Sequence, residues 1–163
     1  MILKGFDELK RFLEKPRNIV VVGHRNPDGD AMGSTLALKH YLAKKGHNCT
    51  VVVPNEYPEF LNWLPGSENT YRFDWQNSQS KRVIDNSDLI FLLDFNALHR
   101  VGHDMQKILE AYPNDFAMID HHQQPDDMKY MYSDVEICST CQMVYQFIEM
   151  NNDLDFIDVD IAT

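Results

Sequence analysis

The sequence has little of what marks a secreted or membrane-embedded protein. It contains three cysteines among 163 residues, an odd number that does not suggest a disulfide framework. Its longest apolar runs have the length of a strand and are too short to span a membrane. The N-terminus, MILKGFDELKRFLEKP, mixes charged and apolar residues and so lacks the apolar core of a secretory signal. We expect a cytoplasmic location and no membrane partner.

Positive charge is also scarce. The chain has 15 Lys and Arg against 25 Asp and Glu, which gives a net charge of −10. Such a surface repels long polyanions and argues against a broad nucleic-acid groove on this domain. Clusters of acids that bind a cation remain compatible with it, because a bound metal reverses the sign of the local field.

The one cysteine pair, Cys138 and Cys141, has C-x-x-C spacing. A zinc ribbon needs a second such pair, and none exists. A redox pair normally follows a strand near the start of a thioredoxin-like unit. We therefore interpret these residues as thiols at the start of a helix.

Strand-like and helix-like segments alternate along the chain. Short apolar runs predict strands at 18–23, 48–53, 88–94, 116–120 and, more briefly, 130–133. Helical spacing of apolar residues predicts helices at 5–15, 30–45, 103–112 and 139–150. This order predicts one α/β domain with an open, mostly parallel sheet and helices on both faces. Residues 66–80 fit neither pattern, and 54–65 resembles a loop whose apolar side chains pack inward, namely Phe60, Leu61, Trp63 and Leu64.

Charged side chains follow three of the predicted strands. They are His24, Asp28 and Asp30 after the first, Asp94 at the end of the third, and Asp120, His121 and His122 at the end of the fourth. A lone Asp after a strand is usually a helix cap or a turn former. In a parallel sheet, however, all these strand ends lie at one edge, where open α/β folds bind their ligands. We therefore expect the seven residues to converge on one crevice.

Mixed carboxylate and imidazole side chains suit a divalent cation such as Mn²⁺. Asp28 and Asp30 are two positions apart and can point to different sides. With Asp94 between them, two metals about 3.5–4 Å apart can share one carboxylate. Gly29 and Gly33 allow close approach of a ligand, and the free N–H groups of the helix that follows predict an anion site.

Three motifs resemble those of the DHH phosphoesterases: GHRNPDGDAMGS at 23–34, DFN at 94–96 and DHH at 120–122. The N-terminal helix and PNEYPEFLNWLPG at 54–66 are similar to the bifunctional oligoribonuclease and 3′-phosphoadenosine 5′-phosphate phosphatase type, which is exopolyphosphatase-related. The resemblance implies a Rossmann-like DHH catalytic domain over residues 1–163. It also implies that a fourth motif, with a further metal-binding Asp, and a C-terminal DHHA1-type substrate domain are absent from this chain.

The resemblance further implies a role for each matching residue. His24 and Asp28 would bind one Mn²⁺, Asp30 and His121 the other, and Asp94 would bridge the two; Mg²⁺ or Co²⁺ are alternatives. His122 would contact the scissile phosphate and assist proton transfer, and Asp120 would orient the histidine pair. Arg100 matches an arginine of the family pattern and is a candidate substrate contact. The other four histidines are expected to lie outside the site: His40, His47, His99 and His103.

The predicted function is manganese-dependent, two-metal hydrolysis of short oligoribonucleotides, 3′-phosphoadenosine 5′-phosphate, or both. The expected partners are short single-stranded RNA or a nucleotide as substrate, and a second copy in a homodimer. One alternative is hydrolysis of pyrophosphate, polyphosphate or a cyclic dinucleotide. Another is a non-catalytic nucleotide-binding domain, which needs no such cluster of acids and histidines.

Overall fold

The computed structural model describes residues 1–163 and contains one seven-stranded sheet. The strands are β1 (Ile2–Lys4), β2 (Asn18–Val22), β3 (Asn48–Val53), β4 (Tyr71–Arg72), β5 (Leu89–Leu93), β6 (Phe116–Asp120) and β7 (Tyr130–Ser133). Their order in the sheet is β1-β7-β6-β5-β2-β3-β4. All neighbours are parallel except β1 and β7, so the predicted open, mostly parallel sheet is confirmed.

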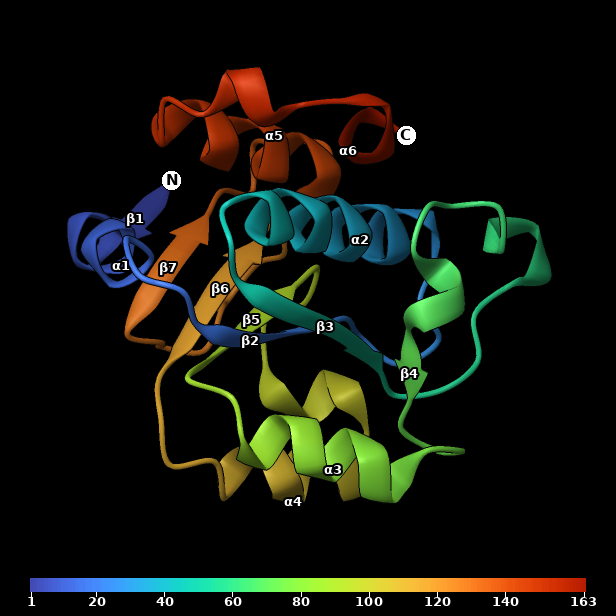
Figure 1. Cartoon of the computed structure of the whole chain (residues 1–163). Helices are drawn as coiled ribbons and strands as arrows, with labels where there is room; N and C mark the ends of the chain where they lie inside the picture. Colours follow the sequence, from blue (N-terminus) through green and yellow to red (C-terminus); the bar gives the residue numbers. More distant parts are fainter.

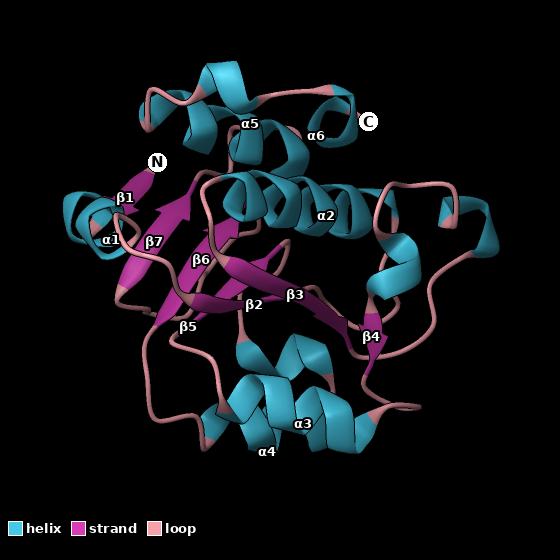
Figure 2. Ribbon diagram, viewed as in Figure 1, coloured by secondary structure: helices cyan, strands magenta, loops and turns pink.

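Helices cover both faces of this sheet, as predicted (Figures 1 and 2). The helices are α1 (Phe6–Phe12), α2 (Gly29–Lys44), α3 (Asn77–Asp85), α4 (His103–Glu110), α5 (Thr140–Met150) and α6 (Val159–Ala162). Buried side chains of α1, α2 and α5 form one core with the sheet, and those of α3 and α4 form a second core on the opposite face. None of the helices combines the length and apolar character needed to cross a membrane.

The order in which strands are added to the sheet reverses between β2 and β5. After β2 it adds β3 and β4 on one side, and it then returns to add β5, β6 and β7 on the other. Neighbouring strands β2 and β5 therefore send their connections in opposite directions. This leaves a crevice at their carboxyl ends, where ligands of such folds bind.

Two helices start next to that crevice, and a side chain caps each of them. The Asp28 carboxylate accepts hydrogen bonds at the start of α2, and Ser139 Oγ accepts one at the start of α5. On α2 the predicted packing residues are buried, namely Leu36, Leu38 and Leu42. On α5 they are buried as well: Met143, Val144, Phe147 and Ile148. The packing of α2 against α5 brings the two helix starts together.

Some segments differ from the sequence predictions. Residues 66–80 include β4 and the start of α3. The sequence of this helix, NSQSKRVID, is mostly polar and contains one fully buried apolar residue, Ile84, so it shows no apolar periodicity. In the loop after β3, Leu61 and Leu64 are buried as predicted, but the prediction for Phe60 and Trp63 is wrong. They are 71% and 66% exposed, because this segment turns with the 3-10 helix Glu59–Leu61, and only Leu61 and Leu64, three positions apart, face inward.

Gly5 joins β1 to α1, and we expect its replacement by alanine to destabilise the fold. Its backbone is left-handed (φ 67°), and an added Cβ would lie 2.8 Å from Tyr130 Cδ1 and 2.9 Å from the Lys129 carbonyl oxygen. Gly46 is a matched control, with φ 90° and no atom within 4 Å of an added Cβ. Both substitutions place alanine in a left-handed conformation at about 1–2 kcal/mol.

The steric overlap should add about 1–3 kcal/mol to the cost of Gly5→Ala alone. Urea unfolding of the two variants measures the difference. Equal losses of unfolding free energy in Gly5→Ala and Gly46→Ala would contradict this packing around Gly5.

Candidate metal centre

The structure brings the predicted charged residues together at the carboxyl edge of the sheet. His24 follows β2, Asp94 follows β5 directly, and Asp120 is the last residue of β6. One group of potential ligand atoms comes from His24, Asp28 and Asp94, and a second from Asp94, His121 and His122; within each group the atoms lie within 4.8 Å of one another. The two groups share only Asp94.

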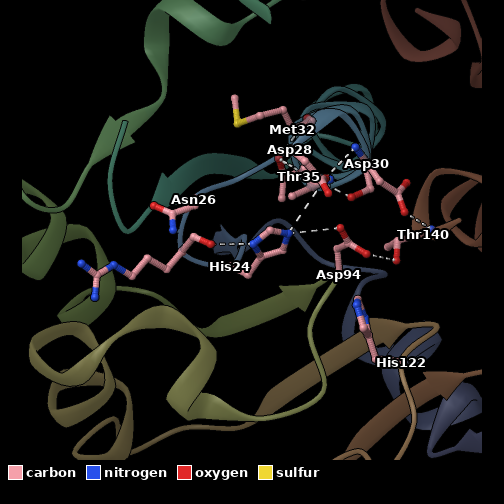
Figure 3. Close-up of polar contacts among 12 residues, drawn as sticks. His24, Asn26, Asp28, Asp30, Met32, Thr35, Asp94, His122 and Thr140 are labelled. Atoms are coloured by element: carbon pink, nitrogen blue, oxygen red, sulfur yellow. Dashed lines mark hydrogen bonds and ion pairs between the residues drawn. The ribbon is translucent and has the colours of Figure 1, made fainter. Parts of the chain in front are cut away.

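Asp94 lies at the centre of the cluster and is 2% exposed. Its Oδ2 is 3.5 Å from His24 Nε2, and its Oδ1 is 3.4 Å from His121 Nε2. Its backbone is left-handed, with φ 64°. Asp and Asn are the side-chain-bearing residues that most often adopt this conformation. The turn after β5 thus aims one buried carboxylate at two histidines, one per oxygen; Figure 3 shows the contact with His24.

Backbone carbonyls fix the orientation of both histidines. His24 Nδ1 lies 2.8 Å from the Arg25 oxygen, and His121 Nδ1 lies 3.1 Å from the Ile137 oxygen. Each Nδ1 therefore carries the proton, so in a neutral ring the Nε2 lone pair faces Asp94. The Nε2 lone pair and the Asp94 oxygen repel each other unless a proton or a metal ion lies between them. The Asp94 carboxylate therefore raises the pKa of His24, and burial of the ring opposes this rise. This donor set fits a divalent metal held by Nε2 and carboxylate oxygens.

Asp28 makes three contacts through one carboxylate oxygen. Its Oδ1 accepts hydrogen bonds from the N–H groups of Asp30 (3.0 Å) and Ala31 (3.1 Å), and it lies 3.9 Å from His24 Nε2. These N–H groups belong to the first turn of α2. The side chain of Asp28 thus occupies two of the N–H groups that were predicted to be free for an anion at this helix start.

Asp30 points away from Asp28 and toward the start of α5. Its Oδ2 accepts the Thr140 N–H at 2.7 Å, and its Oδ1 accepts the Cys141 N–H at 2.8 Å. Its Oδ2 is also 3.7 Å from His121 Nε2. The two acids of the D-G-D motif thus face opposite sides of the cluster, as their spacing predicts.

Asp120 and His122 form a tight pair, and His122 lies in the same group of potential ligand atoms as Asp94. Asp120 is fully buried, and its Oδ1 lies 2.7 Å from His122 Nδ1. Its Oδ2 accepts the backbone N–H of His122 at 3.1 Å. Burial raises the pKa of the Asp120 carboxyl, and the bond from His122 opposes that rise. The pair directs the other edge of the imidazole toward Asp94 (Figure 3).

The remaining predicted residues lie outside this group. Arg100 is exposed on the short helix Leu98–Val101. His40 Nε2 bonds the Pro65 carbonyl at 2.8 Å, and His47 Nδ1 accepts the Arg17 N–H. His99 and His103 are exposed. Neither metal-ligand group includes any of these histidines.

Sequence reasoning missed one residue of the cluster, Thr140. Its hydroxyl donates to Asp94 Oδ1 at 2.8 Å, and its backbone N–H binds Asp30. A signal was present: 130–133 was predicted as a parallel strand, and the next helix was predicted to start at Ser139. A helix that follows such a strand starts at the same edge of the sheet as the acids.

Comparisons with known proteins agree with this architecture. Residues 18–163 match the DHH family, N-terminal domain. An exopolyphosphatase-related protein from Bacteroides fragilis has a similar structure, with a TM-score of 0.93 and 37% identity over 96% of this chain and 46% of that one. A probable manganese-dependent inorganic pyrophosphatase from Enterococcus faecalis is 25% identical over 143 residues, which are 82% of this chain and 42% of that protein.

A further relative is the cyclic-di-AMP phosphodiesterase GdpP of Bacillus subtilis, 23% identical over 86% of this chain and 22% of that protein. The chain thus spans less than half the length of each of these proteins. The family match covers the three motifs and the sheet that carries them. The chain belongs to the DHH family.

Proposed function

We propose that residues 1–163 form the catalytic domain of a phosphoesterase that uses two Mn²⁺ ions. Its substrates would be short oligoribonucleotides, 3′-phosphoadenosine 5′-phosphate, or both. The observation that carries this proposal is the Asp94 carboxylate, which is buried and presents one oxygen to His24 and the other to His121. A carboxylate shared in this way is the usual centre of a two-metal site.

In this proposal His24, Asp28 and Asp94 would hold one ion. Asp30, His121 and Asp94 would hold the second. Mg²⁺ and Co²⁺ are alternative occupants of the same donors. When bound, such ions stabilise charge on phosphoryl oxygens and lower the pKa of water.

The chain itself would supply proton transfer through His122. Asp120 accepts the Nδ1 proton of this residue and so keeps Nε2 free to hold or release a proton. The imidazole is 38% exposed at its side chain, so a substrate can reach it. We assign to His122 contact with the scissile phosphate, and to Asp120 the orientation of that ring. Arg100 remains a candidate substrate contact.

A cavity beside Asp28 favours an organic phosphate over an inorganic one. It has a volume of about 560 Å³ and is lined by Asn26, Pro27, Asp28, Asn55, Glu56, Tyr57, Pro58 and Glu59. It contains no lysine or arginine. A phosphate group placed in this cavity would face the carboxylates of Glu59 and of Glu56, which already pairs with Arg72 at 3.1 Å, whereas sugar hydroxyls and base amino groups find hydrogen-bond acceptors. The second phosphate of 3′-phosphoadenosine 5′-phosphate would therefore lie outside this cavity.

Pyrophosphate hydrolysis is the second candidate. Its support is the name of the Enterococcus faecalis relative, a probable manganese-dependent inorganic pyrophosphatase that matches 82% of this chain. A shared metal centre does not separate the two substrates, because both present a phosphoryl group to it. The surfaces around the centre decide the choice.

Steady-state rates with Mn²⁺ on a diribonucleotide, 3′-phosphoadenosine 5′-phosphate and pyrophosphate test the proposal. We expect a higher kcat/KM for either nucleotide than for pyrophosphate. The opposite order would favour the second candidate. Binding of a nucleotide without turnover of any of the three would instead indicate a non-catalytic domain.

A further inference from the structure

We propose that Thr140, at the start of α5, is a positioning residue that orients two carboxylates of the metal centre. It would hold Asp94 through its side chain and Asp30 through its backbone. This inference rests on the proposed function, because it assigns a role to a residue that touches the ligands and not the substrate.

Thr140 contacts both sides of the cluster from one fully buried position. Its hydroxyl donates to Asp94 Oδ1 at 2.8 Å, and its backbone N–H donates to Asp30 Oδ2 at 2.7 Å. Figure 3 shows it on the side of Asp94 opposite His24. One residue therefore fixes the relative placement of two carboxylates that are 64 positions apart in the chain.

The backbone contact follows from the chemistry of a helix start. The first N–H groups of a helix lack partners within the helix, and the positive end of its dipole attracts an anion. In α5 the Thr140 and Cys141 N–H groups go to Asp30, and the Gln142 N–H goes to Ser139 Oγ. Asp30, a residue of α2, thus completes the capping of α5. This contact requires the start of α2 to lie close to the start of α5.

The hydrogen bond from the Thr140 hydroxyl makes the two carboxylate oxygens of Asp94 unequal. Oδ1 receives the Thr140 proton and lies nearer His121, whereas Oδ2 lies nearer His24 and receives no hydrogen bond. Without the hydroxyl, neither oxygen of the Asp94 carboxylate would accept a hydrogen bond. We therefore expect the Asp30–His121 side of the centre to depend more on Thr140 than the His24–Asp28 side does.

Calorimetric titration of Mn²⁺ into the metal-free protein tests this role without reference to catalysis. Thr140→Val removes the hydroxyl but keeps the branched shape and the backbone N–H. We expect it to weaken one of two Mn²⁺ sites by about 10- to 100-fold, the usual effect of removing a hydrogen bond to a metal ligand. Thr140→Ser, which keeps the hydroxyl, should retain wild-type affinity.

Thr35→Val is the matched control. Thr35 is also fully buried near the centre, but its hydroxyl donates to the Ala31 and Met32 carbonyls of its own helix. It should leave both Mn²⁺ affinities unchanged. If Thr140→Val unfolds, Thr140→Ala gives the same comparison with Thr140→Ser.

Equal affinities in wild type and Thr140→Val would overturn the positioning role, and so would equal losses in Thr140→Val and Thr140→Ser. Loss in Thr35→Val as large as in Thr140→Val would overturn it too, because general disturbance of the helices would then explain both. A wild-type protein that binds no Mn²⁺ would instead refute the proposed metal centre itself.

Discussion

Asp94→Asn is expected to reduce phosphoester hydrolysis by at least about 10³-fold, since a single electrostatic contact in an active site contributes about 10²–10³. The side chain is shared by both halves of the proposed centre, so its loss affects two ions at once. Asparagine is the best replacement for this test. It tolerates the left-handed backbone at this position, and its oxygen can still accept the Thr140 hydroxyl. Turnover and Mn²⁺ titration together measure the effect.

Asp88→Asn provides the control for this variant. Asp88 precedes the same strand at the opposite edge of the sheet, where its Oδ2 accepts the Asn18 N–H at 2.8 Å. The chemical change is identical, but the site is remote, so turnover should match the wild type. Normal hydrolysis by Asp94→Asn would show that the two-metal proposal is wrong.

Asp120→Asn is expected to lower kcat by about 10²–10⁴-fold, the range of a general acid–base contribution. Asp120 accepts two hydrogen bonds from His122, one at each oxygen. An amide has one oxygen acceptor, so either the ring or the backbone N–H loses its partner, and the imidazole can adopt the wrong tautomer. Because neither Asp120 nor His122 is a metal ligand in the proposed centre, the affinity for Mn²⁺ should change little.

The corresponding control is Asp115→Asn, just before the same strand, β6. Asp115 is exposed and pairs with Lys129 at 2.8 Å on the far edge of the sheet. Comparing kcat and Mn²⁺ affinity in the two variants separates an effect on His122 from an effect on β6. Unchanged kcat in Asp120→Asn would exclude a catalytic role for the Asp120–His122 pair.

The sequence predicted the strands that carry the site because their signal is local. Residues 89–93 and 116–120 are short apolar runs that end in charge, and buried parallel strands require that pattern. Convergence of Asp94 with His24 then followed from one rule, that parallel strands end at the same edge of a sheet. The exposed residues Phe60 and Trp63 were mispredicted because one short turn, with two buried leucines three positions apart, is too brief a pattern to separate its two sides.

The cap that Asp28 places on two N–H groups at the start of α2 is a local contact of the kind that an Asp after a strand usually makes, whereas we expected these groups to be free for a phosphate. Contacts that depend on the approach of two helices were not predictable in the same way. The bond from Thr140 to Asp94 joins elements 46 positions apart and requires the packing of α2, α5 and the sheet to be known first. Sequence patterns specify which face of an element is buried, but not which atoms meet across it.

The capping of two helices by Asp28 and Asp30 bears on whether the chain folds before or after it binds metal. In a zinc finger the metal must arrive before the chain can fold, because its ligands have no other partner. Here each carboxylate already has N–H partners in the finished fold. Cation uptake would then be a binding equilibrium on an assembled scaffold, and one ion could replace another without the chain refolding.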